Sequence, residues 1–183
     1  LDGRIFQAKG HDYSAVELFG GDALSAQEFA GGEFCTIYLA PYNYHRIHMP
    51  INARLRHWRY VPGRLFSVNP ATARAMPGLF ARNERVIATF DTDKGPLAMV
   101  LVGALFVGSI ETVWAGQISP PHKRRTEGGN FVAPSPVCLE RGEEMGRFNM
   151  GSTVILLTAP GMVGWDGIAL PGATVRMGQA LGR

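Results

Sequence analysis

The chain has 183 residues, with 18 Lys and Arg against 15 Asp and Glu, a formal net charge of +3. Because 46% of the residues are hydrophobic and only two are Cys, the composition excludes a disordered segment and a disulfide-stabilised scaffold. A charge this small does not by itself indicate nucleic-acid binding. The 23 Gly and 12 Pro predict many turns between short strands, in one domain long enough to bury a core.

Two short helices are the first predicted elements. Ser14 would cap a helix over residues 15–19, and Ser25 would cap a second over residues 26–30. A pair of glycines follows each segment, as expected at helix C-termini. Both helices are too short to persist without packing against the rest of the domain.

Strands are predicted wherever apolar, β-branched or aromatic residues lie between turn residues: 34–39, 54–61, 86–90, 97–102, 154–157 and 171–178. The third and fourth strands should form a hairpin with a longer loop through residues 91–96. The fold class that follows is mainly β (α+β), a single β-rich domain over residues 1–183 with short helices near its N-terminus.

The strand over residues 54–61 could present a basic and aromatic face. A period of two would place on one side Arg54, Arg56, Trp58 and Tyr60. Such a face suits a lipid headgroup region, although a solvated face of a half-buried strand is the alternative.

The apolar run over residues 97–110 is interrupted by Gly103 and Gly108. It is shorter than the ~20 residues that a transmembrane helix needs, so we interpret it as buried strand with bulges or close backbone contacts. Residues 117–137 form the long loop of the chain, functional or mobile, with the basic run Lys123–Arg125. That run could meet phosphates or simply be solvated.

Two histidines form the first candidate chemical site. His45 and His48 lie in the segment 44–50, after the strand that Pro41 ends. Histidine titrates near neutral pH, so this segment could carry acid–base chemistry. A metal site is one alternative, although no Cys, Asp or Glu lies close by to complete a ligand set. Two histidines hydrogen-bonded to the backbone are another.

The pair Gly151-Ser152 is the second candidate site, because it stands where a Gly- and charge-rich stretch meets a predicted strand. The Ser152 hydroxyl can attack the Gly151 carbonyl, which no side chain shields. Elimination from the resulting ester, hydration and loss of ammonia would leave a pyruvoyl group, an electron-accepting ketone. Since Gly-Ser pairs are common, a plain turn before a strand is the alternative.

Ten segments together carry a resemblance over nearly the whole chain: 7–14, 44–50, 60–63, 65–69, 79–85, 102–104, 107–110, 114–116, 144–148 and 150–155. They resemble phosphatidylserine decarboxylase of the bacterial membrane-associated type. The paired-histidine segment and Gly-Ser-Thr at 151–153 are specific in combination. The family motif usually has Leu where this chain has Met150, a substitution that conserves volume.

The resemblance implies an enzyme that makes its own cofactor. The chain would cut itself between Gly151 and Ser152, giving a β subunit from residues 1–151 and an α subunit from residues 152–183 that begins with a pyruvoyl group. This group would form a Schiff base with phosphatidylserine and release carbon dioxide to give phosphatidylethanolamine.

Roles for particular side chains come from the resemblance as well. His48 would take the proton from the Ser152 hydroxyl within an Asp-His-Ser arrangement, and His45 would serve decarboxylation. Substrate-binding residues implied in the same way are Tyr44, Phe66 and Ser67. No metal ligand is implied.

The family's cleavage Asp lies in an Asp-Gly pair well upstream of the segment matching Gln7 and its neighbours. Asp2-Gly3 stands close to Gln7, and we interpret it as a different pair. We therefore expect the cleavage Asp and the family's N-terminal helical region to lie outside this chain.

The resemblance also implies partners and a location: an anionic membrane surface, a homodimer of the αβ unit, no nucleic acid, and a peripheral position on the cytoplasmic face of the bacterial inner membrane. Three alternatives stay open. They are a pyruvoyl-dependent decarboxylase of a soluble amino acid, a non-catalytic β-rich binding module, and a metallohydrolase that uses His45 and His48.

Overall fold

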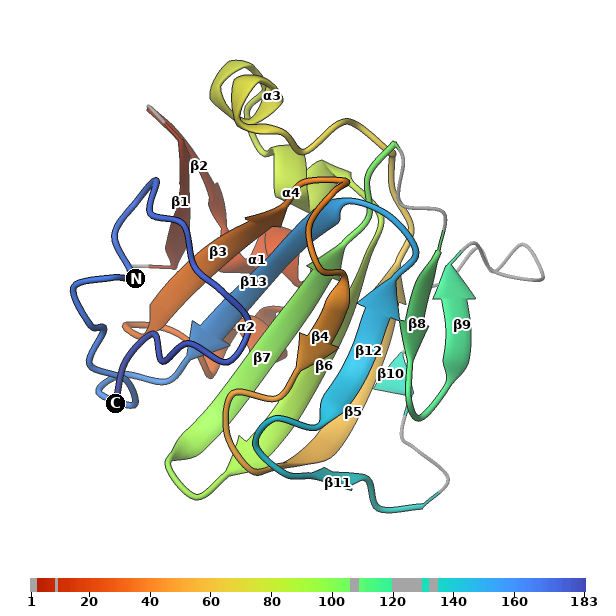
Figure 1. Ribbon diagram of the computed structural model, residues 1–183, viewed down its shortest axis with the longest axis vertical. Helices are drawn as coiled ribbons and strands as arrows, with labels where there is room; N and C mark the ends of the chain where they lie inside the picture. Colours follow the sequence, from red (N-terminus) through yellow and green to blue (C-terminus); the bar gives the residue numbers. More distant parts are fainter. Residues whose placement is uncertain (1–2, 9, 106–108, 120–129, 132–134) are drawn as a thin grey trace.

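The fold is described by a computed structural model over residues 3–8, 10–105, 109–119, 130–131 and 135–183. Its large antiparallel sheet has the order β10–β5–β6–β7–β13–β3, and β11 also pairs with β5 (Figure 1). The strands are β3 (Glu33–Leu39), β5 (Ala53–Val61), β6 (Arg85–Thr92), β7 (Gly95–Val102), β10 (Asn130–Phe131), β11 (Cys138–Leu139) and β13 (Ser152–Thr158).

A smaller sheet has the order β4–β12–β8–β9, and an N-terminal hairpin pairs β1 with β2. These strands are β1 (Arg4–Ala8), β2 (His11–Ser14), β4 (Arg46–His48), β8 (Ile110–Thr112), β9 (Gly116–Ser119) and β12 (Glu144–Phe148). The helices are α1 (Ala15–Leu18), α2 (Ala23–Gln27), α3 (Pro70–Ala75) and α4 (Leu79–Arg82).

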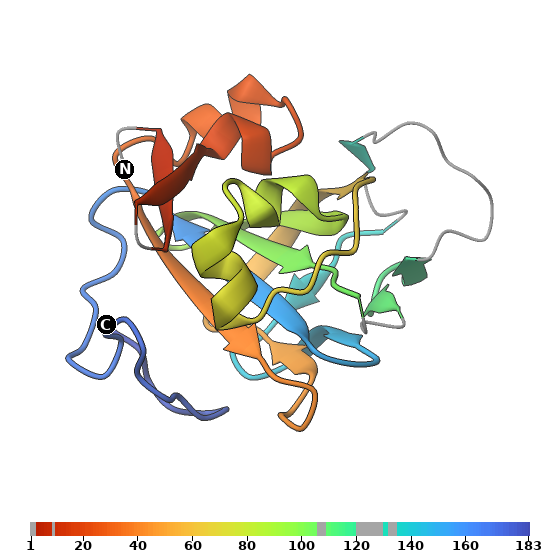
Figure 2. The same ribbon diagram turned by 90° about the horizontal axis from the view of Figure 1, so that it is seen from above.

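The elements form layers around the large sheet. In Figure 1, β4 and β12 lie in front of it and α1 and α2 lie behind, an arrangement seen from above in Figure 2. Strands dominate and the helices are short, so the expected mainly β fold is confirmed. No helix in the described part of the chain is long and apolar enough to cross a bilayer.

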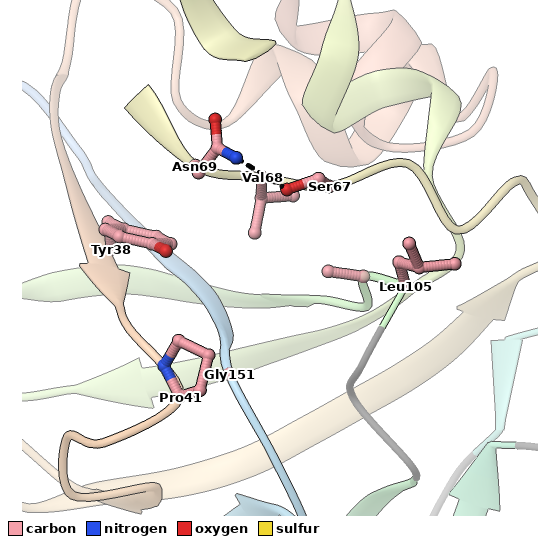
Figure 3. Close-up of a pocket in the computed structure, with 8 residues that line it drawn as sticks. Tyr38, Pro41, Ser67, Val68, Asn69, Leu105 and Gly151 are labelled. Atoms are coloured by element: carbon pink, nitrogen blue, oxygen red, sulfur yellow. Dashed lines mark hydrogen bonds between the residues drawn. The ribbon is translucent and has the colours of Figure 1, made fainter. Parts of the chain in front are cut away.

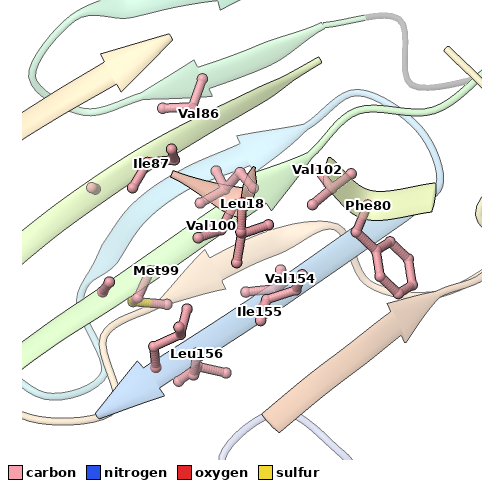
Figure 4. Close-up of a cluster of buried hydrophobic side chains, with 14 of the residues drawn as sticks. Leu18, Phe80, Val86, Ile87, Met99, Val100, Val102, Val154, Ile155 and Leu156 are labelled. Carbon is pink, nitrogen blue, oxygen red and sulfur yellow. The ribbon is translucent and has the colours of Figure 1, made fainter. Parts of the chain in front are cut away.

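The centre of the large sheet forms the core. Nearly all of β6, β7 and β13 is buried, and their side chains pack together with Leu18 and Phe80 from the helices (Figure 4). Strands covered on both faces are apolar along their length instead of alternating. β13 lies between β7 and β3, and its ladder with β3 begins at Ser152 opposite Leu39. The core therefore holds Ser152 at the first position of a central strand.

The sequence prediction identified the start of α1 but not the starts of the other helices. The Ser14 hydroxyl accepts a hydrogen bond from the Glu17 N–H at 3.0 Å, and the Glu17 carboxylate accepts one from the Ser14 N–H at 2.7 Å. The two bonds form a capping box. α2 begins earlier than expected, because Asp22 caps it and accepts the N–H of Ser25 at 3.1 Å. The sequence prediction missed α3 and α4, although an Asn69 cap begins α3.

The prediction that β5 presents a basic and aromatic face is wrong. The register of β5 against β6 shifts between Leu55 and His57, a β-bulge that reverses which side chains point inward. Trp58 and Tyr60 are consequently buried, whereas Arg54 is exposed. The strand offers no continuous surface of the kind expected at a lipid headgroup.

The hairpin of β6 and β7 is confirmed but is tighter than predicted, since its ladder extends to Thr92 opposite Gly95. The prediction of a strand over residues 171–178 is wrong, because the structure describes these residues and has no strand there. Gly172 and Gly178 have φ of 84° and 82°, values that favour turns, and the segment is mostly exposed. Both Asp2 and the basic run Lys123–Arg125 lie outside the described residues.

Candidate active site

Ser152 carries a buried hydroxyl with no hydrogen-bond partner. Its side chain is 0% exposed, and its Oγ bonds to no group among the described residues. An unsatisfied buried polar group costs about 1–3 kcal/mol, so native proteins retain few of them. The hydroxyls of Thr89, Thr112 and Thr153 are buried without a partner among the described residues as well. The position of Ser152 directly after Gly151 is therefore what makes it the centre of the candidate site.

Gly151 packs closely against the end of β3 and the residues after it. A Cβ at this position would lie 3.1 Å from the Pro41 nitrogen and 3.2 Å from the Leu39 oxygen. The sequence suggested glycine here because it leaves the carbonyl open to attack. The structure adds a second reason, because a Cβ here would require the backbone of Leu39 and Pro41 to shift by a few tenths of an ångström.

A small pocket opens beside Gly151. Its enclosed volume is about 30 Å³, and it is lined also by Tyr38, Pro41, Ser67, Val68, Asn69, Ala104 and Leu105 (Figure 3). The Asn69 amide donates to Ser67 Oγ at 3.0 Å, so two polar groups lie on one wall. The enclosed space holds about one or two water molecules, so the pocket is a shallow hollow beside Gly151 in which only a few atoms of a larger molecule could be seated.

Asn83 joins two walls of the pocket. It is 0% exposed, and its amide donates to the carbonyls of Phe66 and Gly103, both at 2.8 Å. Its oxygen accepts the Phe66 N–H at 3.2 Å. Because Ser67 and Ala104 follow these residues directly, one buried side chain holds both walls. The sequence prediction missed Asn83, and no local signal reveals it.

His48 has a defined tautomer. Its Nδ1 lies 2.7 Å from the Gly142 carbonyl, which can only accept, so Nδ1 carries the proton in the neutral ring. Nε2 then has the lone pair and accepts the Tyr44 hydroxyl at 2.7 Å, and the two rings stack 5.7 Å apart. The basic nitrogen of His48 is therefore Nε2.

His45 has the opposite tautomer. Its Nε2 donates to the Pro41 carbonyl at 3.0 Å, which leaves the lone pair on Nδ1. Nδ1 is buried and has no partner among the described residues. The carbonyl of His45 accepts the Phe148 N–H at 3.0 Å. His45 thus has a free basic nitrogen and is linked through Pro41 to the pocket beside Gly151.

The structure brings some of the predicted residues together and leaves others apart. Ser67 shares the pocket with Gly151, whereas Phe66 packs its ring 5.0 Å from the Arg82 guanidinium carbon. Neither histidine hydrogen-bonds to Ser152, whose hydroxyl has no partner in the described chain. Tyr38, Asn69 and Leu105 also line the pocket, and the sequence prediction missed them.

The described residues contain no group of three or more His, Cys, Asp or Glu side chains that could hold a metal ion. The nitrogens of His45 and His48 that have partners bond instead to backbone carbonyls and to Tyr44.

The family model described as phosphatidylserine decarboxylase matches residues 1–183. The chain belongs to the phosphatidylserine decarboxylase family. It is 57% identical over 181 residues to a "phosphatidylserine decarboxylase proenzyme" of Pseudomonas fluorescens, 58% identical over 183 residues to one of a Shewanella strain, and 55% identical over 182 residues to one of Nitrosococcus oceani.

These family members are longer than this chain. The matches cover 98%, 98% and 100% of the chain but 63%, 62% and 60% of the respective relatives. The expected family is confirmed, and the described residues correspond to under two thirds of each of these proteins.

Proposed function

We propose that the protein is a phosphatidylserine decarboxylase that converts phosphatidylserine to phosphatidylethanolamine and carbon dioxide. Family membership and the names of the relatives support this activity. The observation that carries the proposal is the buried, unpartnered hydroxyl of Ser152 directly after Gly151. If this hydroxyl reacts with its own chain, no bound substrate is needed to explain why it lacks a hydrogen-bond partner among the described residues.

We propose self-cleavage between Gly151 and Ser152, consistent with relatives named as proenzymes. Ser152 Oγ would attack the Gly151 carbonyl carbon, passing its proton to a base while the peptide C–N bond breaks and the nitrogen is protonated. A base would then remove the Cα proton of residue 152, and elimination would release residues 1–151 with a C-terminal carboxylate and leave dehydroalanine at position 152. Water would replace the nitrogen of that residue, which leaves as ammonia, to give the pyruvoyl carbonyl. Residues 152–183 would begin at the former Ser152.

His48 is the proposed base for this attack. Its Nε2 has the lone pair that a proton acceptor needs, because Nδ1–H is fixed on the Gly142 carbonyl. Tyr44 occupies Nε2 at 2.7 Å, so its hydroxyl would turn aside as the proton arrives.

Position 152 fits a pyruvoyl cofactor. The Ser152 hydroxyl has no hydrogen-bond partner among the described residues, so its conversion would leave no other group unsatisfied. When present, this group supplies a carbonyl that condenses with an amine and accepts electrons. Ser67 and Asn69, which line the hollow beside Gly151, would bind polar atoms of the headgroup at its mouth. The free Nδ1 of His45 would take up a proton released from the substrate ammonium group and return it to the carbon that loses carbon dioxide.

We propose further that the pocket end of the molecule meets an anionic membrane at the cytoplasmic face of the inner membrane. Apolar side chains are exposed on the segments around the pocket, at Tyr42, Leu65, Leu105 and Met150, which supports a lipid-facing rim. The homodimer expected from the resemblance stays a prediction.

A vesicle assay tests the activity. The protein, expressed at its full natural length, should release carbon dioxide from phosphatidylserine vesicles but not from free serine. Ser152→Ala should abolish release while keeping a native thermal melt, because the alanine removes a hydroxyl that makes no hydrogen bond. Release from free serine alone would favour the soluble amino acid as substrate, and full activity of Ser152→Ala would refute the proposed chemistry.

A further inference from the structure

The proposed cleavage segment crosses between the two sheets. β12 ends at Phe148 in the small sheet, and β13 begins at Ser152 in the large sheet. On the far side of the crossing Ser152 is held by its ladder with β3 and by complete burial. The geometry of the bond between residues 151 and 152 therefore depends on how the near side is held.

Asn149 is the anchor on the near side. Its N–H donates to the Ser109 carbonyl at 3.1 Å, and its side-chain amide donates to Glu111 Oε1 at 2.9 Å and to Ser109 Oγ. Only Met150 and Gly151 lie between this anchor and Ser152. Such a short connection leaves the chain little freedom to turn the Gly151 carbonyl away from the Ser152 hydroxyl.

The Glu111 carboxylate holds the chain on both sides of Phe148. One oxygen accepts from Asn149, and the other accepts from Arg147 Nη2 at 2.6 Å and Nε at 3.0 Å. These hydrogen bonds lower the pKa of Glu111 below its ordinary value. The bond from Asn149 has the largest effect on that pKa, and the bonds from Arg147 come next. On the other edge of β12, the Phe148 N–H bonds to the His45 carbonyl at 3.0 Å.

We infer that Glu111 is a positioning residue for chain cleavage, holding Asn149 so that the Gly151 carbonyl faces Ser152 Oγ. This inference rests on the proposed self-cleavage. The Arg147 and Glu111 side chains are 41% and 21% exposed. Ion pairs this exposed add little to stability, so the contact should affect cleavage geometry more than folding.

The test follows cleavage of the full-length protein by denaturing electrophoresis after rapid synthesis, with a thermal melt of each variant. Glu111→Ala should slow cleavage about 10- to 100-fold, because small displacements of reacting groups have effects of this size. Glu111→Gln keeps an oxygen that can accept from Asn149 and should recover part of the rate. Asn149→Ala breaks the same contact from the other side and should match Glu111→Ala, with no further loss in the double variant.

Glu28→Gln is the matched control, since Glu28 also pairs with an arginine, Arg56 at 2.5 Å, but touches no part of the cleavage segment. It should cleave at the wild-type rate. Wild-type rates in both Glu111→Ala and Asn149→Ala would overturn the inference. A rate loss that Glu28→Gln shares, or that tracks a lower melting temperature across all variants, would also overturn it. Failure of the wild-type protein to cleave would instead overturn the proposed function.

Discussion

Asn83 shows how much one side chain can determine at the residue scale. Its three hydrogen bonds, to both backbone groups of Phe66 and to the Gly103 carbonyl, are made in complete burial. Because the segments after these residues line the pocket, Asn83 controls the pocket's shape without lining it.

Asn83→Ala should lower the free energy of unfolding by about 2–3 kcal/mol, because buried backbone groups lose their partners. It should also raise the KM for phosphatidylserine more than it lowers kcat, since the pocket walls move while Ser152 stays in its ladder. Urea unfolding and vesicle kinetics would measure the two effects. Equal stability and an unchanged KM would show that the two walls are held by other contacts.

The functional residues differ in how far the sequence reveals them. Gly151, Ser152 and the histidines stand in short motifs whose chemistry can be inferred locally. Asn83 and Glu111 act on groups 17 to 38 residues away, so their roles exist only once the sheets have formed. No local sequence pattern predicts hydrogen bonds between residues this far apart in the chain.

At the scale of elements, β5 and β6 are joined across the bulge by a carboxylate. Asp91 on β6 accepts from Arg56 Nη2 at 2.6 Å and from Arg54 at 3.0 Å. The hydrogen bond from Arg56 is the main reason that the pKa of Asp91 lies below its ordinary value of 3.8.

A lowered pKa means that the folded protein prefers the charged carboxylate more than the unfolded chain does. The stability due to Asp91 is therefore present above its unfolded pKa of 3.8 and is lost as the pH falls through the lower folded value. Asp91→Asn should be less stable than the wild type at pH 7, and the difference should shrink below pH ~4. Chemical denaturation at both pH values measures this, and a difference independent of pH would contradict it.

The elements that sequence reasoning missed depend on distant partners. α1 was predictable because Ser14 and Glu17 cap it within one turn. α3 and α4 are held by Gln7, whose amide donates to the Ala73 and Met76 carbonyls and whose oxygen accepts the Leu79 N–H. The bulge in β5 likewise arises from its pairing with β6, so strand periodicity alone assigned the wrong face.

For the whole molecule, the proposed cut would place β13, an interior strand of the large sheet, in the smaller of the two pieces. β13 is buried along its length and pairs with β7 on one edge and β3 on the other. Burial of this kind holds the two pieces together after the peptide bond is gone. We therefore expect cleavage to leave the fold intact and to become visible only after denaturation.

Denaturing mass spectrometry of active, full-length protein shows whether the chain is cut between Gly151 and Ser152. We expect two polypeptides, one that ends at Gly151 and one that begins at position 152 with a blocked N-terminus whose carbonyl is reduced by borohydride. Ser152→Ala should give a single uncut chain. An active wild-type protein with one continuous chain and an intact Ser152 would contradict self-cleavage as the origin of the activity.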